Sequence, residues 1–248
     1  MTPEEIERYA RHIVLREIGG PGQNKLLSAK LLCVGAGGLG SPALLYLAAA
    51  GVGTLGIVDN DLVSLSNLQR QVLHETEAIG EAKTASAVRA LARVNPQIEV
   101  IEHNTRLTEH NIDEVISGYD IVLDGTDNFA TRYLINAACV RAKTPLVSAA
   151  MSQWEGQISL YDPANGGPCY QCVFPEAPAE GLAPNCAQAG VMGALAGVMG
   201  SMMAGEAIKL ITGAGQVLRG ELLMYDALYG EIRKLKTTAR PSCPICAS

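Results

Sequence analysis

The sequence predicts an α/β protein with a mostly parallel sheet that continues into a mixed or antiparallel extension. Up to about residue 150, apolar runs of strand length alternate with longer helical runs, as in consecutive parallel βαβ units. Beyond that point the alternation ends, and short strand-like runs flank one long apolar run. A glycine-rich loop follows the first predicted strand, so we expect a Rossmann-like first half.

The glycine-rich loop lies between the apolar run Leu31–Val34 and the Ala/Leu-rich run Ser41–Ala50. In such a strand–turn–helix unit the first glycine makes a tight turn, the second lets the backbone approach a phosphate, and the last allows close helix–strand packing. The amino end of the helix presents free N–H groups and a positive dipole end to an anion. The loop predicts nucleotide binding through Gly35, Gly37, Gly38 and Gly40.

Polar residues follow the ends of several predicted strands. Asp59 ends the second strand about 20 residues after the last glycine, where a carboxylate can accept hydrogen bonds from ribose hydroxyls. Because the carboxyl ends of parallel strands meet at one edge of a sheet, we expect these residues to converge above the glycine loop. Two cations suit a triphosphate, and an additional acid suits Mg²⁺. The set comprises Asp59, Asp61, Asn67, Arg70, Lys83 and Asp127.

This convergence fits phosphoryl or nucleotidyl transfer better than hydride transfer, which needs neither triphosphate-binding cations nor a magnesium acid. Each residue also has an ordinary interpretation. Arg70 and Lys83 could be solvated surface cations, and Asp127 could cap a helix that starts near Phe129. Their occurrence together at successive strand ends favours a functional site.

Four of the seven cysteines form two Cys-x-x-Cys pairs. One pair alone would also fit a redox motif, but two pairs complete the four thiolates of a tetrahedral zinc site. Such a closed site has no open position for substrate, so we predict a structural zinc staple that ties the C-terminal tail to a mid-chain loop. The predicted ligands are Cys169, Cys172, Cys243 and Cys246.

The remaining elements are predicted from periodicity and from Gly and Pro breakers. Residues 4–18 have the pattern of one amphipathic helix with Ile6, Tyr9, Ile13 and Val14 on one face, ended by the glycines of residues 19–22. Helices are expected at 83–94, 109–116 and 129–142, and strands at 98–103, 120–124 and 145–149. The extension has expected strands at 157–161, 220–225 and 231–236.

The long apolar run at residues 189–211 has Gly-x-x-x-Gly spacing and could be mistaken for a membrane span. It is only weakly hydrophobic and contains Glu206 and Lys209, so we predict a buried core or interface helix. We divide the chain into an N-terminal helical arm at 1–28, a nucleotide-binding half at 29–150 and a zinc-stapled half at 151–248.

Charge and composition exclude several classes of protein. The net charge of −6 and the lack of a basic run argue against nucleic-acid binding. A hydrophobic fraction of 48% with 18% charged residues is typical of a well-packed α/β protein and not of a disordered one. The polar, acidic start of the chain is no signal peptide, so we expect a cytoplasmic protein without membrane contact.

Several motifs together resemble the bacterial MoeB/ThiF family, the relatives of ubiquitin-activating enzymes that adenylate small sulfur-carrier proteins. The most specific are the string SLSNLQRQ at residues 64–71 and DGTDN at 124–128. The string RYARH at 8–12, the glycine loop, DND at 59–61, EGQ at 155–157 and both cysteine pairs add to it. The likeness covers nearly the whole chain.

The resemblance implies a single ThiF-type adenylation domain that uses ATP and Mg²⁺. It implies that Asp59 holds the ribose and that Asp127 holds Mg²⁺. Asn67, Arg70 and Lys83 would bind the phosphates and stabilise charge as pyrophosphate leaves.

The resemblance also implies a homodimer in which Arg11 reaches the phosphates of the neighbouring subunit. The substrate would be the C-terminal Gly-Gly carboxylate of a ubiquitin-like sulfur carrier, bound by the second half of the chain. Its attack on the α-phosphate gives an acyl-adenylate and needs no general base, because a carboxylate is already ionised at neutral pH. The carrier could be of the molybdopterin type, the thiamine type or a related one.

Cys186 matches the cysteine that forms a thioester in ubiquitin-activating relatives and a sulfur linkage in ThiF-type enzymes. A helix start just downstream could favour its thiolate form, but a passive loop thiol fits the sequence equally well. The chain ends two residues after Cys246, without the rhodanese-like domain of longer relatives. We therefore expect a separate sulfur donor, either a cysteine desulfurase or a rhodanese-type protein.

Two other functions are compatible with parts of the sequence. An NAD-dependent Rossmann oxidoreductase would explain the glycine loop and Asp59, but not the string at 64–71 or the zinc staple. A non-catalytic scaffold would bind a ubiquitin-like partner without turning over ATP, and the combination of Arg70, Lys83 and Asp127 argues against it.

Overall fold

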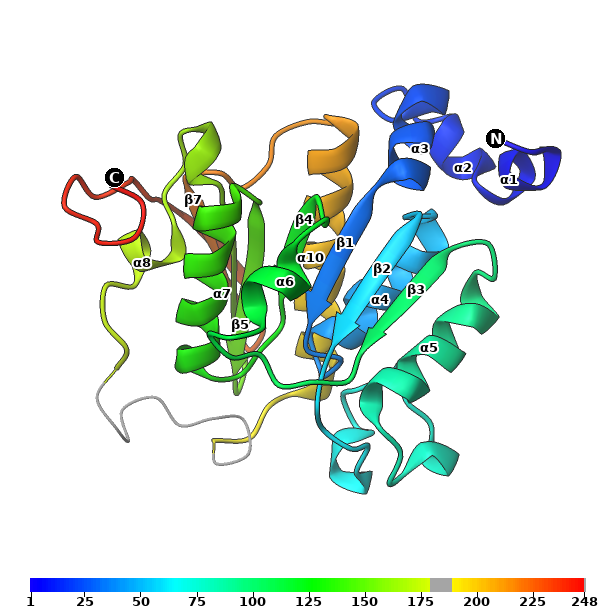
Figure 1. The fold of residues 1–248 in the computed structure, drawn as a ribbon, viewed down its shortest axis with the longest axis horizontal. Helices are drawn as coiled ribbons and strands as arrows, with labels where there is room; N and C mark the ends of the chain where they lie inside the picture. Colours follow the sequence, from blue (N-terminus) through cyan, green and yellow to red (C-terminus); the bar gives the residue numbers. More distant parts are fainter. Residues whose placement is uncertain (179–188, 248) are drawn as a thin grey trace.

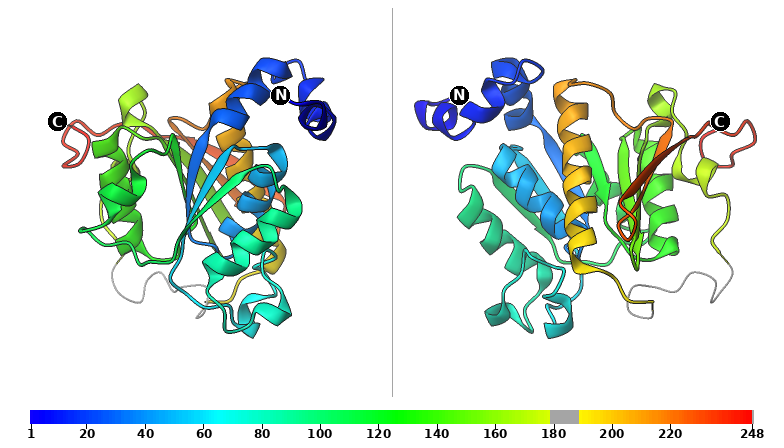
Figure 2. Two further views of the ribbon diagram at one scale, coloured as in Figure 1. Left: turned by 45° about the vertical axis from the view of Figure 1, so that its right-hand side comes forward. Right: turned by 180° about the vertical axis from the view of Figure 1, so that it is seen from behind.

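The computed structural model describes residues 1–178 and 189–247 and has one twisted sheet with helices on both faces (Figure 1). Within these residues the sheet contains eight strands in the order β3-β2-β1-β4-β5-β6-β7-β8. Two hydrophobic cores lie on its opposite faces, one under α4 and α10 and the other under α6 and α7. The rear view in Figure 2 shows α4 and α10 side by side on their face.

The first five strands of the sheet are parallel, as predicted for the first half. The central strands are buried along their whole length, because helices cover both faces, and this explains why they occur as continuous apolar runs. The strands are β1 (Lys30–Val34), β2 (Thr54–Val58), β3 (Glu99–His103), β4 (Ile121–Asp124) and β5 (Leu146–Ser152).

The sheet then continues antiparallel, which confirms the predicted extension. β6 (Glu155–Tyr161) returns along β5, with Leu146 paired to Tyr161. β7 (Glu221–Asp226) and β8 (Glu231–Lys236) add an antiparallel hairpin. Every residue of β8 is exposed, so this strand forms an open edge of the sheet.

The helices that cover the sheet follow the predicted order. One face carries α4 (Gly40–Ala50), α5 (Lys83–Val94) and α10 (Gly193–Thr212). The other carries α6 (Ile112–Ile116) and α7 (Phe129–Ala142), and the short α8 (Tyr170–Val173) follows β6.

Helix α10 is long and apolar enough to cross a membrane by length and composition. It packs instead against α4, β5 and β6, and Leu195, Met199 and Met203 are fully buried. A buried core helix at this position was predicted, although α10 begins at Gly193, later than expected.

The prediction of one amphipathic helix over residues 4–18 is wrong. The arm contains α1 (Pro3–Arg8), α2 (Ala10–Ile13) and then α3 (Gly19–Ser28). The first break is at Tyr9, whose buried hydroxyl accepts a hydrogen bond from Asn95 Nδ2 at 2.9 Å. The Tyr9 ring covers Gly51, where a Cβ would lie 2.4 Å from the ring. Tertiary packing of one aromatic side chain thus overrides the helical period, and Ile6 and Val14 stay exposed.

Candidate active site and metal centre

A cavity of about 580 Å³ opens at the carboxyl ends of the parallel strands. The loops after β1, β2, β3 and β4 contribute to its wall, as does the β5–β6 hairpin. This is the edge at which open α/β sheets bind ligands. The cavity brings together eight of the residues predicted for the site: Gly35, Gly37, Gly38, Asp59, Asp61, Arg70, Lys83 and Asp127.

The glycine loop has three different steric requirements. Gly35 has φ +95°, a left-handed conformation that favours glycine, and its N–H donates to the Val58 carbonyl at 2.8 Å. A Cβ on Gly40 would lie 1.8 Å from the Gly35 carbonyl oxygen, so helix and strand approach too closely for a side chain. A Cβ on Gly37 would meet only the Gln71 amide at 3.6 Å. Gly37 therefore leaves space on the cavity side, whereas Gly40 is a packing position outside the lining.

Asp59 fixes the end of β2 to the glycine loop. Its Oδ2 accepts a hydrogen bond from the Ala36 N–H at 2.8 Å, and its Oδ1 accepts from the Asp61 N–H at 2.9 Å. The carboxylate is half-buried and lines the cavity. It is well placed to accept further hydrogen bonds from a ligand, because each carboxylate oxygen has two lone pairs.

Lys83 is not a solvated surface cation. It is the first residue of α5 and is 5% exposed. Its Nζ donates to Asp61 Oδ2 at 2.8 Å, and Asp61 itself is largely exposed. Arg70 is half-buried on the same wall, and its Nη1 donates to the Ser66 carbonyl at 3.1 Å. The cavity thus has two cations, and each keeps N–H donors that are not used by these contacts and can bind a ligand.

Asp127 lines the cavity directly after β4 and does not cap the next helix. That role belongs to Asn128, whose Oδ1 accepts from the Thr131 N–H at 2.9 Å. The loop is fixed from below by the fully buried Asp124, which accepts hydrogen bonds from the Thr126 N–H and the Ser148 hydroxyl. The Asp127 carboxylate is therefore held at the rim without serving as a structural cap.

Besides Gly40, two predicted site residues lie outside the cavity lining, and a third is outside the described residues. Asn67 belongs to a short 3₁₀ turn outside the cavity lining, and its backbone carbonyl accepts from the N–H groups of Arg70 and Gln71. Arg11 is on α2, which lies beside the amino ends of the strands, at the opposite end of the sheet from the strand ends that line the cavity (Figure 1). Cys186 lies outside the described residues.

Sequence reasoning missed two buried residues that hold the loops of the site, and one of them, Arg132, also lines the cavity. His74 is buried; its Nε2 donates to the Ala36 carbonyl at 2.8 Å, and its Nδ1 accepts from the Ser86 hydroxyl at 2.9 Å. Burial lowers the pKa of His74, so this neutral arrangement is favoured. Arg132 is 7% exposed and donates from Nη2 to the Thr126 carbonyl at 2.6 Å. The partners of His74 come from other elements of the chain, whereas Arg132 reaches back six residues to the loop after β4, and neither contact belongs to a recognised motif.

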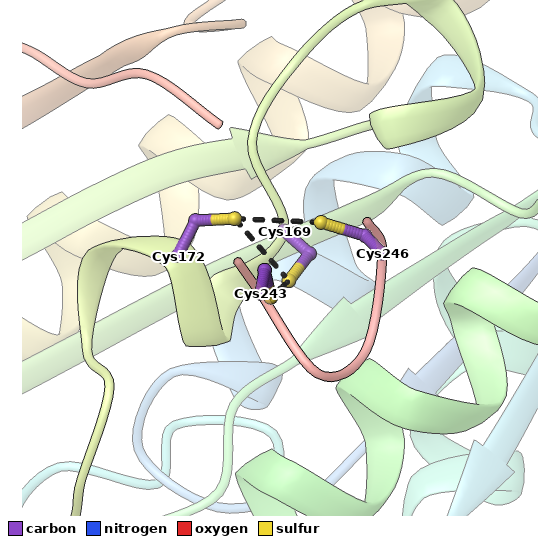
Figure 3. Close-up of side chains that lie close together, drawn as sticks. All are labelled: Cys169, Cys172, Cys243 and Cys246. Carbon is purple, nitrogen blue, oxygen red and sulfur yellow. Dashed lines mark hydrogen bonds between the residues drawn. The ribbon is translucent and has the colours of Figure 1, made fainter. Parts of the chain in front are cut away.

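The four predicted zinc ligands form a compact cluster between α8 and the C-terminal loop (Figure 3). All four sulfurs lie within 4.8 Å of one another. The separation is 3.8 Å for Cys169–Cys172, 3.6 Å for Cys169–Cys243 and 3.4 Å for Cys172–Cys246. Zn–S bonds of about 2.3 Å in a tetrahedron place sulfurs about 3.8 Å apart. The donor set and its spacing therefore fit zinc, and the chain brings both pairs together as predicted.

The fold and the strand-end cavity place this chain in the class of nucleotide-binding α/β proteins. More specifically, the chain belongs to the ThiF family, whose family model matches residues 9–245. The resemblance inferred from the motifs is thereby confirmed.

Similar proteins have closely related names. The sulfur carrier protein adenylyltransferase of Thermus thermophilus is 47% identical over 99% of this chain and 92% of its own length. The SAMP-activating enzyme E1 of Haloferax volcanii is 46% identical over 98% of this chain and 89% of its length. The adenylyltransferase and sulfurtransferase MOCS3 of Aedes aegypti is 48% identical, and the chain spans 56% of that longer relative.

Solved structures of E. coli MccB have the same fold. The complex with MccA-N7isoASN superposes with a TM-score of 0.87 at 25% identity, over 97% of this chain and 75% of MccB. The complex of MccB with ATP superposes with a TM-score of 0.82 at 25% identity, over 92% of this chain and 70% of MccB.

Proposed function

We propose that the protein uses ATP and Mg²⁺ to adenylate the C-terminal Gly-Gly carboxylate of a ubiquitin-like sulfur-carrier protein. The observation that carries this proposal is the convergence of Lys83, Arg70 and Asp127 on one cavity above the glycine loop. The names of the relatives support the substrate class, and the MccB complex with ATP supports the nucleotide. The carrier is of the molybdopterin, thiamine or a related type.

The cavity suits a nucleoside triphosphate along its length. Asp59 would accept hydrogen bonds from the ribose, next to the backbone that follows β2. The open side of Gly37 would let the phosphates approach the backbone N–H groups and the positive end of α4. Arg70 and Lys83 would neutralise the phosphates, with Asn67 shaping the turn that carries Arg70.

In the proposed reaction, a carboxylate oxygen of the carrier attacks the α-phosphorus of ATP. The bond between the α-phosphorus and the bridging oxygen breaks, and its electron pair leaves with pyrophosphate. Lys83 and Arg70 stabilise the charge that develops on the leaving group, and their existing contacts limit the reorganisation needed. Asp127 would hold Mg²⁺, which supplies charge neutralisation between the phosphates when bound. No proton has to be removed from the attacking carboxylate, so positioning accounts for most of the rate.

The four-cysteine cluster would hold a structural Zn²⁺. Its four ligands leave no open coordination position, and the site joins the C-terminal loop to α8. We assign it no step in the reaction. Sulfur transfer, with or without Cys186, would follow adenylation and require a separate sulfur donor.

We also propose a cytoplasmic homodimer built from a single adenylation domain, divided into the arm at 1–28, the nucleotide-binding half at 29–150 and the carrier-binding half at 151–248. The arm exposes Val14 and Leu15, which follow Arg11 in the chain, and the segment that carries Arg70 exposes Leu65 and Val72. Exposed apolar side chains of this size favour contact with another protein surface. Arg11 of one subunit would then complete the phosphate site of the other.

Carrier-dependent ATP–pyrophosphate exchange tests the proposed function. The protein is incubated with Mg²⁺, ATP and labelled pyrophosphate, without a carrier and with molybdopterin-type and thiamine-type carriers that end in Gly-Gly. Exchange that appears with one carrier and disappears when its last glycine is deleted supports acyl-adenylation and identifies the carrier type. Nucleotide binding without exchange for any carrier would instead support the scaffold function.

A further inference from the structure

Helix α7 connects the nucleotide cavity with the cysteine cluster. It starts at the loop after β4 and ends at the level of α8 and the C-terminal loop (Figures 1 and 2). The cap residue of α7 and three residues of the helix contact the site loop or the cysteine segment. They recur at four-residue spacing, so they lie along one side of the helix. In order from the cavity to the cluster these are Asn128, Arg132, Asn136 and Val140.

The amino end of α7 holds the loop that carries Asp127. Asn128, the cap of the helix, directly follows Asp127. One turn further, the Arg132 guanidinium donates to the Thr126 carbonyl at 2.6 Å and lies 5.6 Å from the centre of the Phe129 ring. Hydrogen bonds therefore attach α7 to the residues on both sides of Asp127, and a shift of the helix must move that carboxylate.

The other half of α7 is held by the cysteine cluster. Asn136 Oδ1 accepts a hydrogen bond from the N–H of Tyr170 at 2.8 Å, and Tyr170 directly follows Cys169. Both residues are buried. Val140, one turn beyond Asn136, packs against the cysteines themselves. The position of this part of α7 thus depends on the segment that carries two of the four thiols.

The polar side chains along this path are costly for a hydrophobic core. Among the described residues, Asn136 Nδ2 is buried without a hydrogen-bond partner, and the Tyr170 hydroxyl interacts with the buried Arg132 guanidinium. Unpaired buried polar atoms destabilise a fold, so apolar side chains of similar size would satisfy packing better. The polar residues Arg132, Asn136 and Tyr170 are therefore better explained by a need to hold α7 in position than by a contribution to stability.

We propose that Arg132 and Asn136 are positioning residues that couple metal binding at the cysteine cluster to Mg²⁺–nucleotide binding in the cavity. The proposal rests on the proposed function, because it takes Asp127 as the Mg²⁺ carboxylate. Coupling between two binding sites is reciprocal. Zinc at the cluster strengthens nucleotide binding, and Mg²⁺–nucleotide strengthens zinc binding by the same factor.

The test measures both directions of this coupling. Titration calorimetry gives the Kd for Mg²⁺–ATP in zinc-loaded and zinc-depleted protein, with Mg²⁺ in excess over ATP. Competition with a chromophoric chelator gives the zinc affinity with and without Mg²⁺–ATP. For the wild-type chain we expect zinc depletion to raise the nucleotide Kd about tenfold, within the usual range of allosteric coupling. Mg²⁺–ATP should raise the zinc affinity by the same factor.

Asn136→Ala removes the link to the Tyr170 N–H, and Tyr170→Phe removes the interaction of the Tyr170 hydroxyl with the Arg132 guanidinium while keeping the ring and the backbone N–H. Both variants should bind zinc stoichiometrically, but their nucleotide Kd should no longer depend on zinc. Arg141→Ala is the matched control, because Arg141 is on the exposed side of the same helix and pairs with Asp113 at 2.6 Å. It should keep the full coupling.

The outcomes separate the two proposals. If zinc-loaded wild-type protein does not bind Mg²⁺–ATP, the proposed function fails and the coupling fails with it. If it binds Mg²⁺–ATP with the same Kd after zinc depletion, the coupling alone is overturned. If Asn136→Ala and Tyr170→Phe show the same coupling as the wild-type chain, the coupling does not run through these α7 contacts and the proposal is overturned. Should Asn136→Ala fail to fold, Tyr170→Phe still decides between these outcomes.

Discussion

The nucleotide cavity and the cysteine cluster of this molecule are built in different ways. The cavity collects single side chains from the ends of several strands, and it is open to solvent with exposed acids at its rim. The cluster collects four thiols from two short segments and brings all sulfurs within 4.8 Å. The cavity leaves part of each polar group available to a ligand, whereas the four thiols of the cluster would all serve as ligands of one metal ion.

This difference shows that, in this fold, the residues expected to act in the reaction and the residues expected to stabilise the fold lie at different sites. Substitutions at the rim of the cavity should change activity with little effect on folding, because exposed groups contribute little to the free energy of unfolding. Substitutions in the cluster should do the reverse, apart from the coupling through α7. Four predictions test this separation, in order of decreasing expected effect.

Asp127→Ala should abolish adenylation. The carboxylate is exposed at the rim and does not cap α7, so its removal leaves the fold and the zinc content unchanged. We expect a loss of about 10³-fold or more in carrier-dependent ATP–pyrophosphate exchange, as for removal of one transition-state contact. Thermal unfolding and metal analysis of the same sample provide the control. Retained exchange would remove Asp127 from the Mg²⁺ site.

Cys243→Ser should lower the free energy of unfolding by about 4 kcal/mol or more through loss of zinc, because the loss of a bound metal is among the largest effects of single substitutions. Denaturant titration measures the change, and Cys139→Ser, in the core but away from the cluster, controls for the loss of a thiol. Nucleotide affinity should fall only by the coupling factor. Complete loss of nucleotide binding in folded Cys243→Ser protein would contradict the separation.

The two glycines Gly40 and Gly37 should respond differently to alanine. A Cβ at position 40 would meet the Gly35 carbonyl oxygen at 1.8 Å, so Gly40→Ala should destabilise the fold by about 3 kcal/mol. Gly37→Ala meets only the Gln71 amide, at 3.6 Å, and should fold normally but bind Mg²⁺–ATP more weakly. Unfolding curves and calorimetry on both variants check this. Equal stability losses would refute the assignment of Gly37 to the ligand side.

His74 should make the stability pH-dependent below neutrality. Its pKa in the folded chain is lowered by burial from the ordinary value of 6.5, so the unfolded chain binds a proton at higher pH than the folded chain. The stability contribution is fully present above pH 6.5 and is lost as the pH falls from 6.5 to the folded-state pKa, by at most about 1.4 kcal/mol per pH unit. Comparing His74→Gln with the wild-type chain from pH 7.5 to about 5 isolates this slope. A wild-type slope that persists in the variant would exclude His74 as its source.

Much of the fold and of the cavity could be predicted, because the signals were local. The glycine loop, the acid after β2 and the alternation of strands and helices are set by short segments. The four cysteines could be grouped because two identical spacings match one tetrahedral metal. Even the antiparallel extension followed from the change of pattern near residue 150.

The missed features depend on contacts between distant segments. Tyr9 breaks the predicted N-terminal helix because its ring packs on Gly51 and its hydroxyl accepts a hydrogen bond from Asn95. His74 contacts Ala36, and Asn136 contacts Tyr170, across separations that no periodic pattern reports. The burial of Lys83 likewise arises from packing at the start of α5.

The most direct test of the central claim is intact-mass spectrometry of the carrier after incubation with the protein, ATP and Mg²⁺. Our account predicts an AMP adduct on the C-terminal glycine, which appears in wild-type reactions and is absent with Asp127→Ala or with a carrier that lacks its last glycine. An unmodified carrier in the presence of folded protein, bound nucleotide and pyrophosphate release would contradict it, because ATP would then be cleaved without transfer of AMP to the carboxylate.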